Sequence, residues 1–279
     1  MNKSDKYCMA LVRESDHGRY LATLFAPAEQ RSALFSLYAF DIEISRIRDL
    51  AREPMPGEIR LQWWREVLEG QRAGEAAANP VSMALLATLA RHRLAAEKLI
   101  ALLEAHRFDV YDEPMPTLAA LQSYGSNTAG AIFDCASRIL GAPSEENAIE
   151  AGQAQTIANV IALLPHHAAR HQLFMPLDLL RHYGSTPDEI FALQASSGLR
   201  AVLAELRLRA RRHLTRIAEL SVNIPEKTWP AFLSLAPLKP WLSAMESAAY
   251  QPFQPPELSA WRRQWRIWRA AKSLERIGR

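Results

Sequence analysis

The sequence predicts an all-α protein built as a single domain. Apolar residues recur at spacings of three and four along nearly the whole chain, and no convincing alternation of period two is present. Leu, Ala, Arg, Glu and Gln dominate while β-branched residues are sparse, a mixture that favours helices. The 279 residues allow one large domain or two small ones, but the only linker candidate, 251–256, is too short to separate two. We therefore expect one domain over residues 1–279.

Prolines mark several of the expected helix boundaries. A helix begins at Pro27, since proline suits the first helical position, and it runs to about Arg52, where Pro54 and Pro56 stop it. Pro165 stops another. Together with the Pro27 helix, the periodic segments predict helices at 57–70, 81–109, 117–140, 145–164, 197–221, 226–245 and 257–275.

Cysteine content and hydropathy exclude two classes of protein. Two cysteines, Cys8 and Cys135, cannot supply a disulfide framework or a four-cysteine zinc site. We expect both to be buried thiols in a reducing compartment. No apolar run approaches the roughly 18 residues that span a bilayer, and residues 1–6 are polar and lack the apolar core of a secretory signal. We expect a cytoplasmic protein that is neither secreted nor integral to a membrane.

The positive charge is confined to the C-terminal tail. Residues 257–279 contain seven Lys or Arg against two Glu, a balance of +5, so the +3 of the whole chain leaves −2 for the remaining residues. The sequence pI near 8.9 therefore describes the tail and not a generally basic surface. This distribution argues against a nucleic-acid partner.

The tail is expected to form a basic, tryptophan-rich helix. Trp261, Trp265 and Trp268 stand at i, i+4 and i+7 and so share one helix face. Among the flanking cations are Arg262, Arg266 and Arg269. Two interpretations stay open. The helix lies on the inner membrane as a peripheral contact with anionic lipid, or the tryptophans pack against the bundle while the arginines are solvated.

A family resemblance is carried by four ordered blocks, none of which is a phosphate loop, a catalytic triad or a metal-binding Cys/His pattern. The blocks are Leu37-Tyr38-Ala39-Phe40, then Trp63-Trp64-Arg65, then 107–111 with Tyr124 and 128–130, then 154–164 ending in Phe174-Met175-Pro176. In this order and spacing they resemble the squalene/phytoene synthase family of head-to-head prenyltransferases over roughly residues 15–270. The resemblance implies the isoprenoid synthase fold, a helical bundle around a central cavity.

The resemblance also implies two aspartate motifs on facing helices. Carboxylates four residues apart share a helix face, and two such pairs hold magnesium ions that bridge the substrate diphosphates. Here the positions of the first motif are Ser45, Arg46 and Asp49, so one carboxylate remains. Asp41 lies on the same face, but two turns from Asp49, about 12 Å along the axis. One small octahedral ion cannot join them directly.

The second motif falls on Leu163 and His167, and residues 151–177 contain no Asp or Glu at all. The region instead carries the basic string 165–171. We therefore expect no catalytic residue, no metal ligand and no cofactor at these motifs. We expect a magnesium cofactor only if the chain is an active prenyltransferase.

The same replacement suggests a pocket that binds an anion directly. Arginine and histidine side chains can replace a metal as partners of a prenyl diphosphate or an anionic lipid head. We expect Arg48 and His171 at the rim of this pocket. The alternative is a solvated helix end without a ligand, because helix C-termini favour such residues. The candidate pocket residues are Tyr38, Asp41, Ser45, Arg46, Asp49, Asn159, His166, His167 and Arg170.

Two local strings, 55–64 and 167–178, look like the branch of this family that includes a respiratory complex I assembly factor. That likeness implies a non-catalytic role in respiratory complex assembly, with a partner from that complex, or in isoprenoid and lipid handling at the membrane face. The main alternative is an active enzyme that condenses two prenyl diphosphates head to head. A third possibility is a soluble lipid or isoprenoid carrier.

Overall fold

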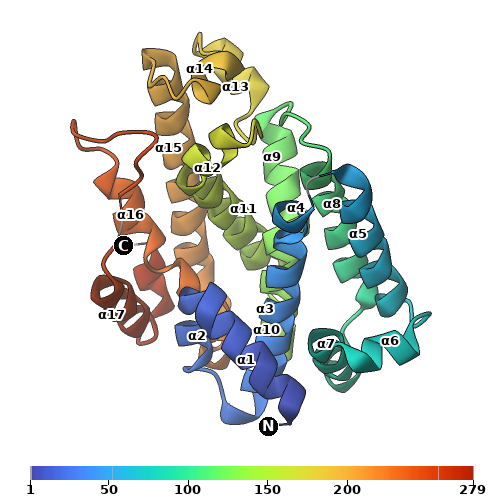
Figure 1. The fold of residues 1–279 in the computed structure, drawn as a ribbon. Helices are drawn as coiled ribbons and strands as arrows, with labels where there is room; N and C mark the ends of the chain where they lie inside the picture. The colour runs from blue at the N-terminus through green and yellow to red at the C-terminus, as the bar shows by residue number, and fades with distance from the viewer. Residues whose placement is uncertain (1, 52, 257, 279) are drawn as a thin grey trace.

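The computed structural model describes residues 2–51, 53–256 and 258–278, and most of this part of the chain is helical. Figure 1 shows the helices gathered around a long central group. Within the described ranges there is no named β-strand, so the all-α prediction is confirmed. No helix there is both long and apolar enough to cross a bilayer.

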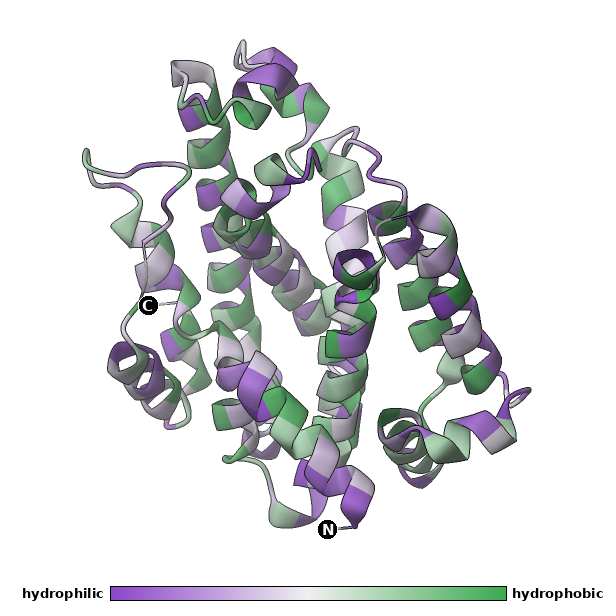
Figure 2. Cartoon of the chain, in the orientation of Figure 1, coloured by the Kyte–Doolittle hydropathy of each residue, from purple (hydrophilic) through white to green (hydrophobic). Residues whose placement is uncertain are grey.

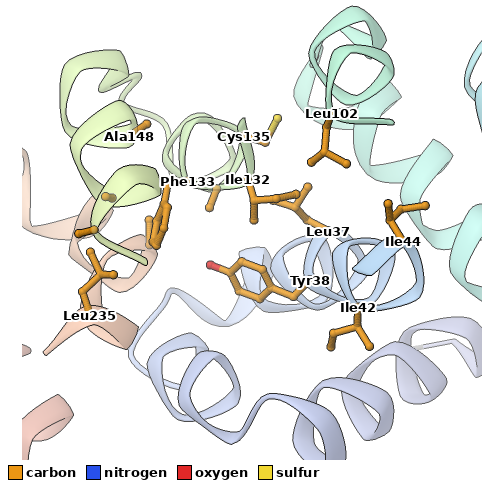
Figure 3. Close-up of a cluster of buried hydrophobic side chains, with 14 of the residues drawn as sticks. Leu37, Tyr38, Ile42, Ile44, Leu102, Ile132, Phe133, Cys135, Ala148 and Leu235 are labelled. Atoms are coloured by element: carbon orange, nitrogen blue, oxygen red, sulfur yellow. The ribbon is translucent and has the colours of Figure 1, made fainter. Parts of the chain in front are cut away.

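Four helices form the centre of the bundle. They are α3 (Arg31–Ser45), α10 (Ala131–Ile139), α11 (Glu145–Ala162) and α15 (Ser197–Leu220). Helix α11 packs between α15 and α10, and α10 in turn packs on α3. Figure 3 shows Leu37 and Tyr38 of α3 facing Ile132 and Phe133 of α10 in the core.

Shorter helices surround this centre. The N-terminal and outer ones are α1 (Lys3–Ser15), α2 (His17–Thr23), η1 (Ala28–Gln30), α4 (Ile47–Leu50), α5 (Pro54–Leu68), α6 (Ala73–Ala78), α7 (Pro80–His92) and α8 (Ala96–Val110). The later ones are α9 (Leu118–Gly125), the π-helix η2 (Ser126–Gly130), α12 (Leu164–Ala169), α13 (Leu177–His182), α14 (Pro187–Phe191), η3 (Ser221–Asn223), η4 (Glu226–Ala231), η5 (Leu233–Leu235), α16 (Leu238–Ala244), α17 (Ala260–Ala270) and η6 (Leu274–Ile277).

Three expected helices are divided in the structure. The segment 81–109 breaks at Arg93, whose φ of 51° is left-handed and ends α7. The segment 117–140 passes through a π-helix where α11 comes very close: a Cβ on Gly152 would lie 2.5 Å from the carbonyl oxygen of Gly125. The helix from Pro27 gives η1, α3 and α4; its expected end, Arg52, lies outside the described residues.

Prolines account for the other differences. The helix expected at 145–164 ends at Ala162, just before Pro165, as predicted. Pro165 itself lies in the first turn of the next helix, α12, where its missing N–H costs nothing. Pro54 likewise opens α5, three residues before the predicted start. The segment 226–245 is not one helix, because Pro230 interrupts it and Pro237 precedes α16.

The tail is shorter than expected. Helix α17 covers 260–270 of the predicted 257–275, followed by the 3₁₀ turn η6. Residues 257 and 279, the ends of the predicted tail segment, lie outside the described part. Figure 2 shows α17 coloured mainly hydrophilic, as its arginines require.

Candidate functional site

Two cavities lie along α3 and α11 and share part of their walls. The larger, about 920 Å³, reaches toward Trp241 and α17, and we name it the tail cavity. The smaller, about 420 Å³, is bordered by three histidines, and we name it the histidine cavity. The shared wall residues are Arg19, Asp41, Ser45, Gln155 and Asn159. The geometry thus gives the chain a central cavity in two connected parts.

Arg19 and Asp41 form a buried ion pair in the shared wall. The Arg19 guanidinium donates to the Asp41 carboxylate, and each residue is only 9% exposed. Arg19 also pairs with Asp16 of the tail cavity, with 3.6 Å between Nε and Oδ2. Its guanidinium lies 5.1 Å from the centroid of the Tyr38 ring. Burial raises the pKa of Tyr38, so the phenol stays neutral.

Asp49 on α4 forms an ion pair with a residue at the end of α12. Arg170, at the C-terminal end of α12, forms an ion pair with it, and His166 Nε2 lies 3.6 Å from the same carboxylate. Arg170 also donates to the Arg48 carbonyl at 2.9 Å. Arg48 in turn pairs with Asp112. Two cationic side chains therefore tie α4 to the segments around it.

Asp109 accepts hydrogen bonds from two other wall residues of the histidine cavity. His106 Nδ1 lies 2.7 Å from its Oδ2, and the Tyr124 hydroxyl donates to both oxygens at 2.8 and 3.0 Å. Burial raises the pKa of Tyr124 well above its usual value, and the Asp109 carboxylate adds to this effect. Burial opposes a charge on His106, but Asp109 outweighs it and the pKa of His106 is raised.

His167 is neutral at physiological pH. Burial, with the neighbouring His166 charge, lowers its pKa to about 4. The ring packs on Phe174 with 4.6 Å between the ring centroids. Where the family's second motif would supply a carboxylate, this chain supplies an uncharged imidazole.

The donor set fits magnesium poorly. Every aspartate on the walls of the two cavities accepts a hydrogen bond or ion pair from the protein itself: Asp16 and Asp41 from Arg19, Asp49 from Arg170, and Asp109 from Tyr124. A hard cation needs several free oxygen ligands at close range. In the described part of the chain, no three His, Cys, Asp or Glu side chains converge as metal ligands would.

The comparison with known proteins decides the family. Residues 12–269 match the sequence model described as Squalene/phytoene synthase. The chain belongs to the squalene/phytoene synthase family.

Relatives within this family include both assembly factors and enzymes. The chain is 27% identical over 255 residues to "NADH dehydrogenase (ubiquinone) complex I, assembly factor 6" of Bos taurus, covering 90% of this chain and 77% of that protein. It is 24% identical to a phytoene synthase of Arthrospira platensis, covering 90% and 87%. The squalene synthase structure from Alicyclobacillus acidocaldarius superposes with a TM-score of 0.76 at 23% identity, covering 91% of this chain and 95% of that one. The expected isoprenoid synthase bundle is thus confirmed.

The structure brings most of the predicted pocket residues of this squalene/phytoene synthase relative together. Arg46 lies in the tail cavity, and four more residues, Asp49, Arg48, His166 and His167, lie in the histidine cavity. The shared wall adds Asp41, Ser45 and Asn159.

Three predicted residues do not lie on either cavity wall. The Tyr38 ring packs against the Arg19 guanidinium. Arg170 forms an ion pair with Asp49, a wall residue of the histidine cavity. His171 packs against Phe191, with 4.9 Å between the ring centroids.

Several wall residues were not predicted from the sequence. Arg19 is the main one, because an arginine in a short helix is normally solvated and nothing in its local pattern indicates a partner 22 residues later. Gln155 could have been found, since it lies one turn before Asn159 and its amide donates to that side chain at 2.8 Å. Trp241 and Arg263 reach the tail cavity from the C-terminal part of the chain.

The tail helix of this family member turns its tryptophans outward. Trp261, Trp265 and Trp268 are 65%, 43% and 48% exposed, whereas Ile267 and Ala270 are buried against the bundle. The interpretation in which the tryptophans pack on the core is therefore wrong, because Ile267 and Ala270 occupy that position.

Proposed function

We propose that this chain is a non-catalytic squalene/phytoene synthase-like protein that acts in respiratory complex assembly or in isoprenoid and lipid handling at the membrane face. One observation carries the proposal: the aspartates that line the central cavity are held by the chain's own arginines and by Tyr124. A catalytic carboxylate must be free to bind metal and so stabilise the departing diphosphate. Carboxylates that are already neutralised by internal cations serve the structure of the cavity instead.

The tail cavity is suited to an amphiphilic anion. Its volume of about 920 Å³ lies within the range of pockets that bury small organic ligands. Apolar wall residues include Ile42, Leu238 and Trp241, and Arg46 and Arg263 supply positive charge. Within the described residues, neither arginine forms an ion pair, and Arg46 donates only to the Ser15 hydroxyl at 2.8 Å. An anionic lipid or a prenyl diphosphate could bind there directly, without a metal.

Similarity to the assembly factor supports a role in respiratory complex assembly. The match to assembly factor 6 covers 90% of this chain, and it suggests a partner protein of the respiratory complex. The outward tryptophans and arginines of α17 support peripheral contact with an anionic membrane. We propose that the protein is cytoplasmic and contacts the inner membrane from that side.

The experiment is complementation of a strain that lacks this chain. Asp49→Asn removes the last carboxylate of the first motif while keeping the side-chain shape, and Asp188→Asn on α14, outside both cavities, is the matched control. If the role is non-catalytic, both variants restore the amount of assembled respiratory complex seen on a native gel. Loss of assembly with folded Asp49→Asn, but not with the control, would point to chemistry at Asp49 and contradict the proposal.

The alternative is an active head-to-head prenyltransferase. It is favoured by one observation: Asp41, Asp49 and Asp109 all line the histidine cavity, so three carboxylates would be available if their internal partners moved away. Magnesium-dependent condensation of two prenyl diphosphates would establish this function.

A further inference from the structure

We propose that the turn after α2, formed by Leu24 and Phe25, is a second membrane anchor that inserts beside the tail helix. The partner is an anionic lipid bilayer. The inference rests on the proposed membrane function of α17, which it deepens by adding a separate insertion point and an orientation. We name the five exposed side chains that we propose meet the bilayer the docking face: Leu24, Phe25, Trp261, Trp265 and Trp268.

The turn exposes large apolar side chains while its backbone amides are hydrogen-bonded within the chain. Leu24 and Phe25 are 41% and 43% exposed. Their backbone amides donate to the carbonyls of Leu21 and Ala22 at 3.2 and 3.1 Å. A segment that enters the acyl region must satisfy its polar backbone groups internally, and the donors of this turn meet that condition.

The two parts of the docking face are carried by neighbouring elements. Helix α17 packs against α2, and Figure 1 shows both at the same end of the bundle. Ile267 and Ala270 hold α17 to the bundle, which leaves the tryptophans on the opposite half of the helix. Leu24 directly follows the last residue of α2.

The charge pattern of α17 selects an anionic bilayer over an apolar protein surface. Arg262 lies over Trp261, and Arg266 and Arg269 lie over Trp265, with 5.2–5.5 Å from guanidinium to ring centroid. Helix α17 contains no Asp or Glu. Indole rings at headgroup level with cations beside them are typical of interfacial helices, and each cation adds attraction to anionic lipid.

Docking at two points also gives the tail cavity an orientation. The first turn of α2 supplies His17 and Arg19 to the wall of that cavity, and α17 supplies Arg263. Arg263 lies one turn before the buried Ile267 and so shares the bundle side of α17, opposite the tryptophans. Docking through the tryptophans therefore holds α17 between the bilayer and this wall of the cavity.

The first test is vesicle co-sedimentation with phosphatidylcholine containing phosphatidylglycerol. The double variant Leu24→Ser/Phe25→Ser should bind roughly ten-fold more weakly than wild type, because two apolar side chains no longer leave water. The matched control is Ile59→Ser on α5, an apolar residue that is more exposed, at 63%, and this variant should bind as wild type. Wild-type binding by the folded double variant would overturn the second anchor.

A second measurement does not depend on the double variant folding. Cys8 and Cys135 are buried, so Phe25→Cys can be labelled selectively with an environment-sensitive fluorophore. The emission should shift to the blue on adding the anionic vesicles, while the same label at Ile59→Cys should not respond. No shift at position 25, with α17 still required for sedimentation, would refute the second anchor and leave the proposed function intact. If the wild type does not bind vesicles at all, the membrane part of the proposed function fails as well.

Discussion

Arg170 forms an ion pair with Asp49 although 121 residues separate them in the sequence. The pair joins the end of α12 to α4, and the same guanidinium donates to the carbonyl of Arg48. In a metal-dependent member of the family, the residue at position 49 would face a magnesium ion. In this chain the Asp49 carboxylate is instead paired with an arginine of the protein itself.

A double-mutant cycle tests this relationship. Asp49 is half exposed, so the coupling free energy between Arg170→Ala and Asp49→Ala should be about 0.5–1 kcal/mol. It should shrink in 1 M salt, which screens exposed charges. Urea denaturation of the four proteins measures it. Strictly additive effects at low salt would mean that the pair contributes nothing.

The Arg19–Asp41 pair should behave differently because it is buried. Arg19→Met leaves the Asp41 carboxylate without its partner and should destabilise the protein by about 3–5 kcal/mol. The double variant Arg19→Met/Asp41→Leu should recover most of that loss, since it removes both charges. The control is Arg212→Met on α15, an exposed position. Equal unfolding free energies for Arg19→Met and this control would show that Asp41 is not held as described.

Close packing of α11 gives a third prediction. A Cβ on Gly152 would meet backbone atoms on two sides, 2.5 Å from the oxygen of Gly125 and 2.6 Å from the Cα of Gly130. Gly152→Ala should therefore lower the unfolding free energy by about 1–3 kcal/mol despite the better helix propensity of alanine. Gly74→Ala on α6, where a Cβ meets nothing within 4 Å, should be neutral or stabilising. Thermal unfolding of both variants decides the matter, and a gain for Gly152→Ala would contradict the described contact.

Glu43 on α3 gives a pH-dependent prediction. Burial raises the pKa of its carboxyl to about 6 from an ordinary 4.5. The folded protein therefore binds this proton more tightly than the unfolded chain, and the contribution to stability is complete below pH 4.5 and lost as the pH rises through 6. Glu43→Gln should stabilise the protein by up to about 2 kcal/mol at pH 7, with little effect at pH 4.5. Urea denaturation at the two pH values checks this, and an equal effect at both would contradict it.

Helical periodicity and proline chemistry allowed much of the fold to be predicted. The helix expected at 197–221 matches α15, Ser197–Leu220, because it has a strong amphipathic pattern and no internal proline. The break at Arg93 could not be foreseen, since an arginine with positive φ has no local signal of the kind that glycine gives. Pro165 follows the end of α11 as predicted, but the sequence did not show that it also lies in the first turn of α12, because the two positions of proline look alike in sequence.

Several wall residues of the site could be predicted from the sequence, but their contacts could not. Ser45, Arg46, Leu163 and His167 could be read directly from family spacing. The partners of the remaining carboxylates could not, because Arg19 and Asp41 meet only after α2 has packed beside α3. The orientation of the tail tryptophans was likewise undetermined, since the helix has an apolar side chain, Ile267, on its other face.

We propose above all that this squalene/phytoene synthase relative does not ionise prenyl diphosphates. The most direct test is turnover of labelled farnesyl and geranylgeranyl diphosphate by the folded protein, with and without magnesium. Released diphosphate and condensed hydrocarbon are measured together. We expect neither product under either condition, because the cavity carboxylates are held by internal partners. Magnesium-dependent formation of a condensed hydrocarbon would contradict the account.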